Sequence, residues 1–176
     1  MIKNIIFFLS GFVFIFSCNY EQELDYEATI EKGQLYIENN KIDSAIILFN
    51  EALKIDQNRV EAHYGLGFAY SKNCFNKRVD CEKAIELFAK VNEIEPNYRR
   101  VYYNQALCKG MLFDYKSAII DMDKQIALDG TDSDYFKNRG GFKLLLNDTI
   151  GACEDYKRSV ELGGDIEQKW INEICE

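Results

Sequence analysis

The sequence has few of the residues on which most enzyme centres depend. Its 176 residues include a single histidine, His63, which leaves no basis for a histidine-based triad or an HExxH zinc helix. Neither of the glycine patterns that bind nucleotide phosphates, GxxxxGKS/T and GxGxxG, is present. Carboxylates such as Glu61, Asp134 and Asp155 recur at the spacing of a solvent-exposed helix face, without the two contrasting environments that acid–base catalysis uses. We therefore expect no catalytic residues and no enzyme activity.

Positive charge is also scarce. Lys and Arg total 21 against 29 Asp and Glu, which gives a formal net charge of −8. Nucleic acid is not expected as a partner, because its phosphates require a Lys- and Arg-rich surface. The six cysteines lack CxxC spacing, so neither a metal site nor a redox motif is predicted, and no cofactor is implied. The single proline and the hydrophobic fraction of 47% indicate one compact domain rather than an extended or disordered chain.

The N-terminus has the order of features of an export signal. Lys3 is followed by an apolar stretch at residues 5–16 and then by Ser17, which is the cation, apolar core and small residue of a secretory signal peptide. The stretch is too short to remain as a membrane span, which needs about 20 residues. We expect residues 1–17 to be a signal peptide.

The end of this segment, Ile15-Phe16-Ser17-Cys18, resembles the lipobox of bacterial lipoproteins, in which the cysteine becomes the lipidated N-terminus after cleavage. The resemblance implies a lipid chain such as palmitate on Cys18, with residues 18–25 as a polar tether. Several acyl chains are needed for a stable anchor. The implied location is the bacterial cell envelope, at the outer membrane, on either its periplasmic or its outer side. The alternative is ordinary cleavage near Ser17 and a free, secreted product.

Four segments of the sequence repeat one pattern, a small residue followed by an alanine. The pairs are Gly33 and Ala45, Gly67 and Ala84, Ala106 and Ala118, and Gly140 and Ala152. Successive alanines lie 39, 34 and 34 residues apart, so five extra residues lie within the second segment. A period of 34 residues is the length of a tetratricopeptide repeat, which consists of two helices, A and B.

The residues around these positions strengthen the resemblance to the tetratricopeptide-repeat family. Tyr36 and Tyr70 are the aromatic residues of helix A, and Pro96 is the proline that closes the second repeat; Lys109 and Lys143 depart from the aromatic pattern. The resemblance implies an all-α solenoid of about four helix-turn-helix repeats. The expected repeats are residues 26–59, 60–98, 99–132 and 133–166. One helix pair cannot cover its apolar stripe alone, so neighbouring pairs must stack.

A further helix is predicted at residues 165–175, where it would cap the end of the solenoid. Asp165 is suited to be its N-cap, and Ile166, Trp170 and Ile174 recur at the spacing of one helix face. The opposite face is polar, as a terminal helix requires.

Five cysteines remain once Cys18 is assigned to lipid. Cys74 and Cys81 bracket the insertion of the second repeat, and Cys153 could reach Cys175 at the end of the capping helix, so these are two possible structural disulfides. Cys108 is expected to be a buried small hydrophobic residue.

In the tetratricopeptide-repeat family, the A helices line a concave groove that binds peptides or helices. Mapped onto this chain, the resemblance implies a groove lined by Tyr64, Phe68, Arg100, Tyr103, Leu107 and Lys137. The aromatic residues would form an apolar contact surface, and Arg100 and Lys137 would contact anionic groups of the partner. Whether Phe68 and Leu107 bind a partner or only complete the packing between A helices is left open. The basic run Asn76-Lys77-Arg78 is interpreted as a solvated turn.

The function expected from these features is a membrane-anchored interaction scaffold of the cell envelope that binds a partner peptide or helix in its groove. The alternative is a self-associating component of an envelope or secretion complex, in which Tyr64 and Tyr103 would form a contact between copies.

Overall fold

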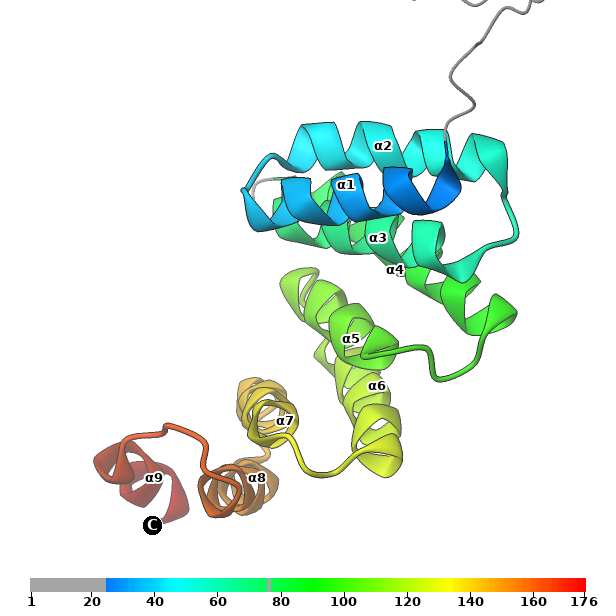
Figure 1. The fold of residues 1–176 in the computed structure, drawn as a ribbon. Helices are drawn as coiled ribbons and strands as arrows, with labels where there is room; N and C mark the ends of the chain where they lie inside the picture. The colour runs from blue at the N-terminus through cyan, green and yellow to red at the C-terminus, as the bar shows by residue number, and fades with distance from the viewer. Residues whose placement is uncertain (1–24, 76) are drawn as a thin grey trace, which may run out of the picture.

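The computed structural model describes residues 25–75 and 77–176, and within these ranges the chain is entirely helical (Figure 1). The described helices are α1 Tyr26–Glu38, α2 Ile42–Ile55, α3 Val60–Asn73, α4 Arg78–Ile94, α5 Val101–Met111, α6 Tyr115–Leu128, α7 Ser133–Leu145, α8 Thr149–Glu161 and α9 Gln168–Cys175. Successive helices pack as four pairs, and each pair stacks on the next in chain order. The predicted all-α solenoid of four helix pairs and a C-terminal helix is confirmed. The pairs also rotate about the stacking axis, so that α1 lies across the view of Figure 1 whereas α7 is seen nearly end-on.

Each helix pair is held together by a small residue on helix A that faces a large residue on helix B. A β-carbon added to Gly33 would lie 2.8 Å from the Phe49 ring, and one added to Gly140 would lie 3.1 Å from the Tyr156 ring. The third pair has Met122 in place of an aromatic residue, and there the small residue is Ala106. The alanines of the repeat, Ala45, Ala84, Ala118 and Ala152, are all fully buried. The repeated pattern is therefore a steric fit between helices A and B.

Aspartates begin four of the helices by accepting hydrogen bonds from otherwise unpaired backbone N–H groups. Asp25, Asp114, Asp132 and Asp148 are the N-caps of α1, α6, α7 and α8, with carboxylate-to-nitrogen distances of 2.9–3.2 Å. The extra residues of the second repeat lie beside the turn from α3 to α4. They lengthen α4, which is the longest of the described helices.

The C-terminal helix differs in detail from its prediction. It begins at Gln168, and its N-cap is Glu167 rather than Asp165, whose backbone carbonyl instead accepts a hydrogen bond from Lys137 Nζ at 3.2 Å. The residue that α9 buries is Ile171, while Trp170 remains partly exposed with its ring against Tyr156. Ile171 is thus the buried residue of α9, one position beyond the predicted Trp170, while Ile166 and Ile174 pack against the same cluster.

Candidate interaction site

A hollow of about 450 Å³ lies between α3 and α5, the A helices of the second and third repeats. Five of the six predicted groove residues line it: Tyr64, Phe68, Arg100, Tyr103 and Leu107. The remaining lining residues are Ser71, Lys72, Cys74, Asn104, Cys108 and Met111. The structure thus brings most of the predicted groove into one continuous surface. Lys137 is the exception, because it lies on α7 and reaches the segment before α9.

Tyr64 anchors the α3 side of the hollow. Its ring lies parallel to that of Phe68, with centroids 6.2 Å apart, and meets Tyr98 edge-on at 5.3 Å. Its hydroxyl accepts a hydrogen bond from Asn104 Nδ2 on α5 at 3.0 Å. This bond joins adjacent A helices across the base of the hollow. Tyr64 therefore contributes to the packing between repeats and to the surface of the hollow at once.

Arg100 and Tyr103 form the α5 side. The Arg100 guanidinium lies 4.5 Å from the centroid of the Tyr103 ring and forms an ion pair with Asp132 at 2.9 Å. The Tyr103 hydroxyl accepts a hydrogen bond from Asn138 Nδ2 at 3.4 Å, and its ring packs against Tyr135. A cation held over an aromatic face is pre-positioned, which reduces the entropy lost when it contacts a ligand.

Burial raises the pKa of both groove tyrosines. For Tyr64 this effect exceeds the opposing effects of the Asn104 hydrogen bond and the charge of Arg99 on its pKa. For Tyr103 burial is the main cause, and the nearby Asp134 carboxylate raises the pKa further. Both hydroxyls consequently stay protonated at neutral pH and remain able to donate a hydrogen bond.

Sequence reasoning did not identify Asn104 and Lys72 as parts of the hollow. Lys72 places its ammonium 4.9 Å from the centroid of the Phe68 ring, at the rim. A signal for Asn104 was available, because a polar residue that is buried on an A helix needs a hydrogen-bond partner on its neighbour. Phe68 and Leu107 pack against the core and also line the hollow, so both complete the packing between A helices, and their contact with a partner stays a prediction.

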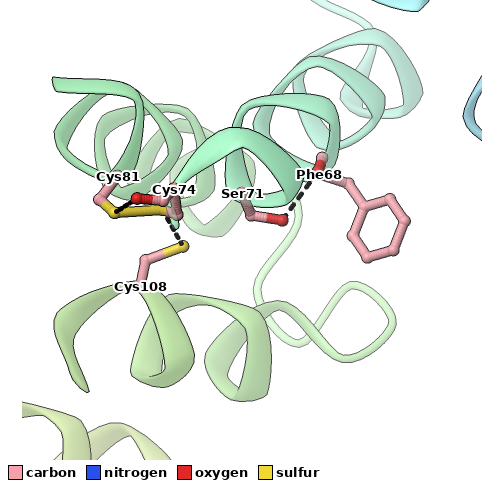
Figure 2. Close-up of a disulfide and its surroundings, with 5 residues drawn as sticks. All are labelled: Phe68, Ser71, Cys74, Cys81 and Cys108. Carbon is pink, nitrogen blue, oxygen red and sulfur yellow. Dashed lines mark hydrogen bonds between the residues drawn. A yellow bond between two sulfur atoms is a disulfide. The ribbon is translucent and has the colours of Figure 1, made fainter. Parts of the chain in front are cut away.

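The cysteines fall into two groups. The structure pairs Cys153 with Cys175, joining α8 to α9 across a Cα–Cα distance of 5.3 Å. It also pairs Cys74 with Cys81, 4.8 Å apart between α-carbons, across the turn from α3 to α4. Figure 2 shows Cys108 approaching this second disulfide from α5, with its sulfur 3.8 Å from that of Cys74. Cys108 is buried and unpaired, as expected of a small core residue.

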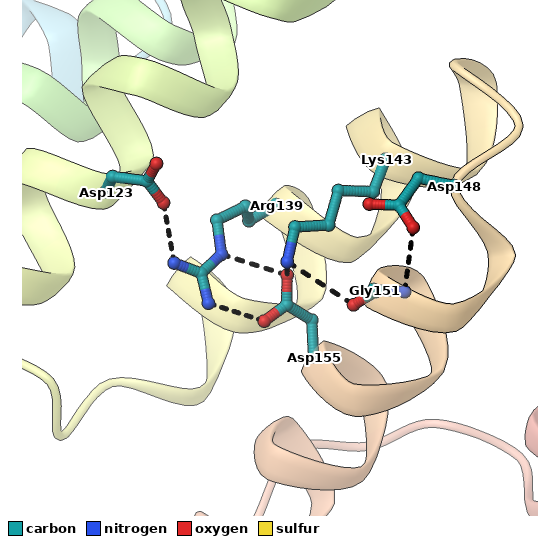
Figure 3. Close-up of polar contacts among 6 residues, drawn as sticks. All are labelled: Asp123, Arg139, Lys143, Asp148, Gly151 and Asp155. Atoms are coloured by element: carbon teal, nitrogen blue, oxygen red, sulfur yellow. Dashed lines mark hydrogen bonds and ion pairs between the residues drawn. The ribbon is translucent and has the colours of Figure 1, made fainter.

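The expectation that Asp155 lies on a solvated helix face is wrong, because this side chain is buried at 3% exposure. Its carboxylate accepts two hydrogen bonds from Arg139, at 2.6 and 2.9 Å, and forms an ion pair with Lys143 at 2.9 Å (Figure 3). Arg139 also bridges to Asp123 on α6 at 2.6 Å. These contacts satisfy the charge of Asp155, so the cluster is a structural tie between α6, α7 and α8.

Asp121 occupies the place of Asp155 in the preceding repeat and is buried in the same way. It forms an ion pair with Lys109 at 2.5 Å. Lys109 and Lys143 are the two lysines that depart from the aromatic pattern of helix A. Each departure is thus matched by an aspartate on helix B of the same repeat, where the first two repeats have Leu48 and Leu87.

Within residues 25–75 and 77–176, no three or more His, Cys, Asp or Glu side chains are grouped so as to hold a metal ion. None of the described helices is long and apolar enough to cross a membrane. Cys18, the predicted lipidation site, and Asn76 lie outside the described residues.

Sequence comparisons support the repeat assignment. A family model described as TPR repeat matches residues 33–73. The chain is 29% identical over 120 residues to tetratricopeptide repeat protein 13 of Homo sapiens, covering 68% of this chain and 14% of that protein. It is 26% identical over 147 residues to a TPR repeat-containing protein of Methanocaldococcus jannaschii, covering 77% of this chain and 26% of that one. The chain therefore spans only a small part of these curated relatives.

Solved structures agree with this result at the level of the fold. MamA from Desulfovibrio magneticus RS-1 superposes with a TM-score of 0.73 at 22% identity, over 81% of this chain and 77% of that one. The chain folds as a tetratricopeptide-repeat solenoid. PilF of Pseudomonas aeruginosa superposes with a TM-score of 0.69 at 20% identity, over 85% of this chain and 65% of that structure.

Proposed function

We propose that this tetratricopeptide-repeat protein is a non-catalytic scaffold, anchored to the cell envelope by lipid on Cys18, that binds a partner peptide or helix between α3 and α5. The observation that carries the proposal is the hollow itself, where aromatic rings and hydrogen-bond donors from two repeats share one surface. The fold supports protein binding, since stacked repeats present extended concave surfaces. The predicted export signal and the resemblance of residues 15–18 to a lipobox support the envelope location.

The chemistry of the hollow favours a segment that carries both an apolar side chain and a hydrogen-bond acceptor. Phe68, Leu107 and Met111 offer apolar contact, and Met111 is 43% exposed at the end of α5. The hydroxyls of Tyr64 and Tyr103 remain protonated donors beside them. The cations of Lys72 and Arg100 lie at the rim and suit an acidic side chain next to the apolar anchor. Aromatic and arginine residues of this kind dominate the binding energy of most interfaces.

Photocrosslinking in native membranes tests the binding surface. A photoreactive phenylalanine analogue at Phe68 and, separately, at Met111 is expected to capture the same protein. The matched control carries the analogue at Glu86, which is exposed on α4 and does not line the hollow. Capture of that same protein with equal yield from Glu86 would show that the hollow is not the binding surface.

Membrane fractionation tests the anchor. Replacing Cys18 by Ala removes the sulfur that lipid would occupy, so the variant is expected to move from the membrane fraction to the soluble fraction. If the Cys18→Ala variant stays with the membranes, the lipid anchor is wrong, whereas crosslinking from Phe68 would still report on the hollow.

A second candidate function is self-association. Exposed apolar side chains at the turns of the third and fourth repeats favour it, chiefly Phe113 at 71% exposure and Ile150 at 76%. Static light scattering over a range of concentrations distinguishes the two functions: a mass that stays at one chain excludes self-association, and a mass that doubles supports it.

A further inference from the structure

Three cysteine sulfurs meet where α3, α4 and α5 come together. Cys74 caps the C-terminus of α3, Cys81 lies in the first turn of α4, and Cys108 lies on α5. Cys74 is bonded to Cys81, and its sulfur also lies 3.8 Å from that of Cys108, which is nearly van der Waals contact. Figure 2 shows the Cys74 sulfur between the other two, with the Phe68 ring pointing away from them.

We propose that these residues form an internal disulfide-exchange site, in which Cys74 can be bonded either to Cys81 or to Cys108. The first bond joins the two helices of one repeat. The second would join the A helices of adjacent repeats. Cys74 is the common member because its sulfur is the one within reach of both partners.

The exchange is balanced without an added oxidant or reductant. The Cys108 thiolate attacks the Cys74 sulfur and forms a new S–S bond, while the Cys74–Cys81 bond breaks. Cys81 leaves as a thiolate and takes up the proton that Cys108 released. Its sulfur already lies 3.6 Å from the backbone oxygen of Cys74, which can accept a hydrogen bond from the new thiol.

Burial limits the rate of the exchange. It raises the pKa of the Cys108 thiol to about 12, so the attacking thiolate is scarce and exchange in the folded protein is slow. Once formed, the Cys74–Cys108 bond would protect the fold against unfolding more than the Cys74–Cys81 bond does, because it closes 34 residues of separation rather than 7 and so restricts the unfolded chain more.

The exchange has a consequence for binding, and this part rests on the proposed function. Both Cys74 and Cys108 line the hollow between α3 and α5. A Cys74–Cys108 bond would hold α3 and α5 together at the end of the hollow where these cysteines lie. It would also free the turn that carries Phe75 and Lys77 from the Cys74–Cys81 bond.

Peptide mapping of the intact, purified protein tests the exchange directly. Trypsin separates the three cysteines, because Cys74 falls in residues 73–77, Cys81 in 79–83 and Cys108 in 101–109. The protein is incubated under native conditions, quenched in acid, denatured, and labelled with N-ethylmaleimide before digestion. The starting pattern is label on Cys108. We expect a gain of label on Cys81 equal to its loss from Cys108, together with a disulfide between 73–77 and 101–109.

Two variants and an internal control sharpen the result. Cys108→Ala should leave Cys74 bonded to Cys81 with no label on either residue. Cys81→Ala, folded in the presence of oxidised glutathione, should contain the Cys74–Cys108 bond. Cys153 and Cys175 have no third cysteine beside them in the described residues and should keep their bond throughout.

Label confined to Cys108 at all times in the wild type, or failure of Cys81→Ala to form the Cys74–Cys108 bond, would overturn the proposal. Neither outcome depends on a partner, so crosslinking from Phe68 can succeed or fail independently.

Discussion

Phe113 stands at a position where the turns of the first and fourth repeats have asparagine. Asn40, Phe113 and Asn147 occupy the same place in the turns of the first, third and fourth repeats, and their φ angles are +57°, +66° and +62°. Asparagine tolerates this left-handed conformation, whereas phenylalanine is strained in it by roughly 1 kcal/mol. The Phe113 ring is largely exposed and has only an edge contact with Tyr115 to offset the strain.

Phe113→Asn is therefore expected to stabilise the protein by about 0.5–1 kcal/mol, because it relieves the strain and loses little burial. Urea denaturation measures the change in the free energy of unfolding. The reciprocal variant, Asn40→Phe, should lose a similar amount, and equal stability of both variants with the wild type would show that the turn backbone relaxes around either residue.

Asp155 is a second position at which one residue decides stability. Replacing it by Asn leaves the largely buried Lys143 without its counter-charge and leaves Arg139 with only the exposed Asp123, and a loss of this kind typically costs about 3–5 kcal/mol. The matched control is Asp123→Asn, because that carboxylate also pairs with Arg139 but is 54% exposed, and its loss should cost less than about 1 kcal/mol. Thermal and urea unfolding of the two variants should differ clearly, and equal costs would contradict the structural role of Asp155.

At the scale of the helix pair, the repeats fill one position between helices A and B in two different ways. The first two repeats place Tyr36 and Tyr70 where the last two place Lys109 and Lys143. Each lysine reaches an aspartate on helix B, so an apolar contact has been exchanged for a buried ion pair. The aspartate is the more deeply buried partner of each pair, so its charge is left poorly solvated when the lysine is removed.

Lys109→Tyr combined with Asp121→Leu gives the third repeat the tyrosine and leucine that the first two repeats have at these positions. The single variant Lys109→Tyr should cost about 3–5 kcal/mol, and Asp121→Leu should cost less because Lys109 can turn to solvent. The double variant should recover most of this loss. A double-mutant cycle of unfolding free energies measures the coupling, and strictly additive costs would show that the two residues do not form one unit.

The packing of the C-terminal helix α9 on α8 depends on a covalent link. The disulfide between Cys153 and Cys175 spans 22 residues, and α9 otherwise buries little beyond Ile171. Cys175→Ala should lower the free energy of unfolding by about 3 kcal/mol. Cys153→Ala should have the same cost because it removes the same bond, and reduction should abolish the difference between each variant and the wild type.

The architecture of the molecule was predictable because each repeat presents the same small and large residues at the same spacing. The period and the four buried alanines follow from residues compared with their counterparts in other repeats, whereas the aromatic lining of the hollow follows from the resemblance to the tetratricopeptide-repeat family. The buried Asp155 was missed because its spacing was judged within one helix, where a carboxylate indicates a solvated face. Comparing Lys143 and Asp155 with Tyr70 and Leu87 would have revealed a paired change. The start of α9 was misjudged because Asp165 is held by Lys137, a contact between segments that local capping preferences do not contain.

Across the whole molecule, contacts run mainly between neighbouring helices, so stability should be transmitted stepwise along the chain. Replacing Ile171 by Asp, which uncovers the end of the solenoid, should reduce amide hydrogen-exchange protection most in α8, less in α6 and least in α2. Hydrogen-exchange mass spectrometry measures the gradient. A uniform loss of protection would show that the protein unfolds as a single cooperative unit.

Each repeat carries both members of the fit between a small and a large residue, as with Gly33 and Phe49 or Ala106 and Met122, and the Phe49 ring also abuts Gly65 of the second repeat across a junction. Duplication of such a unit in the gene would copy both halves of the fit together. Descendants of this protein could therefore lengthen by whole repeats without new compensating mutations inside each copy, and only the junctions with neighbouring repeats would remain to be refined by selection.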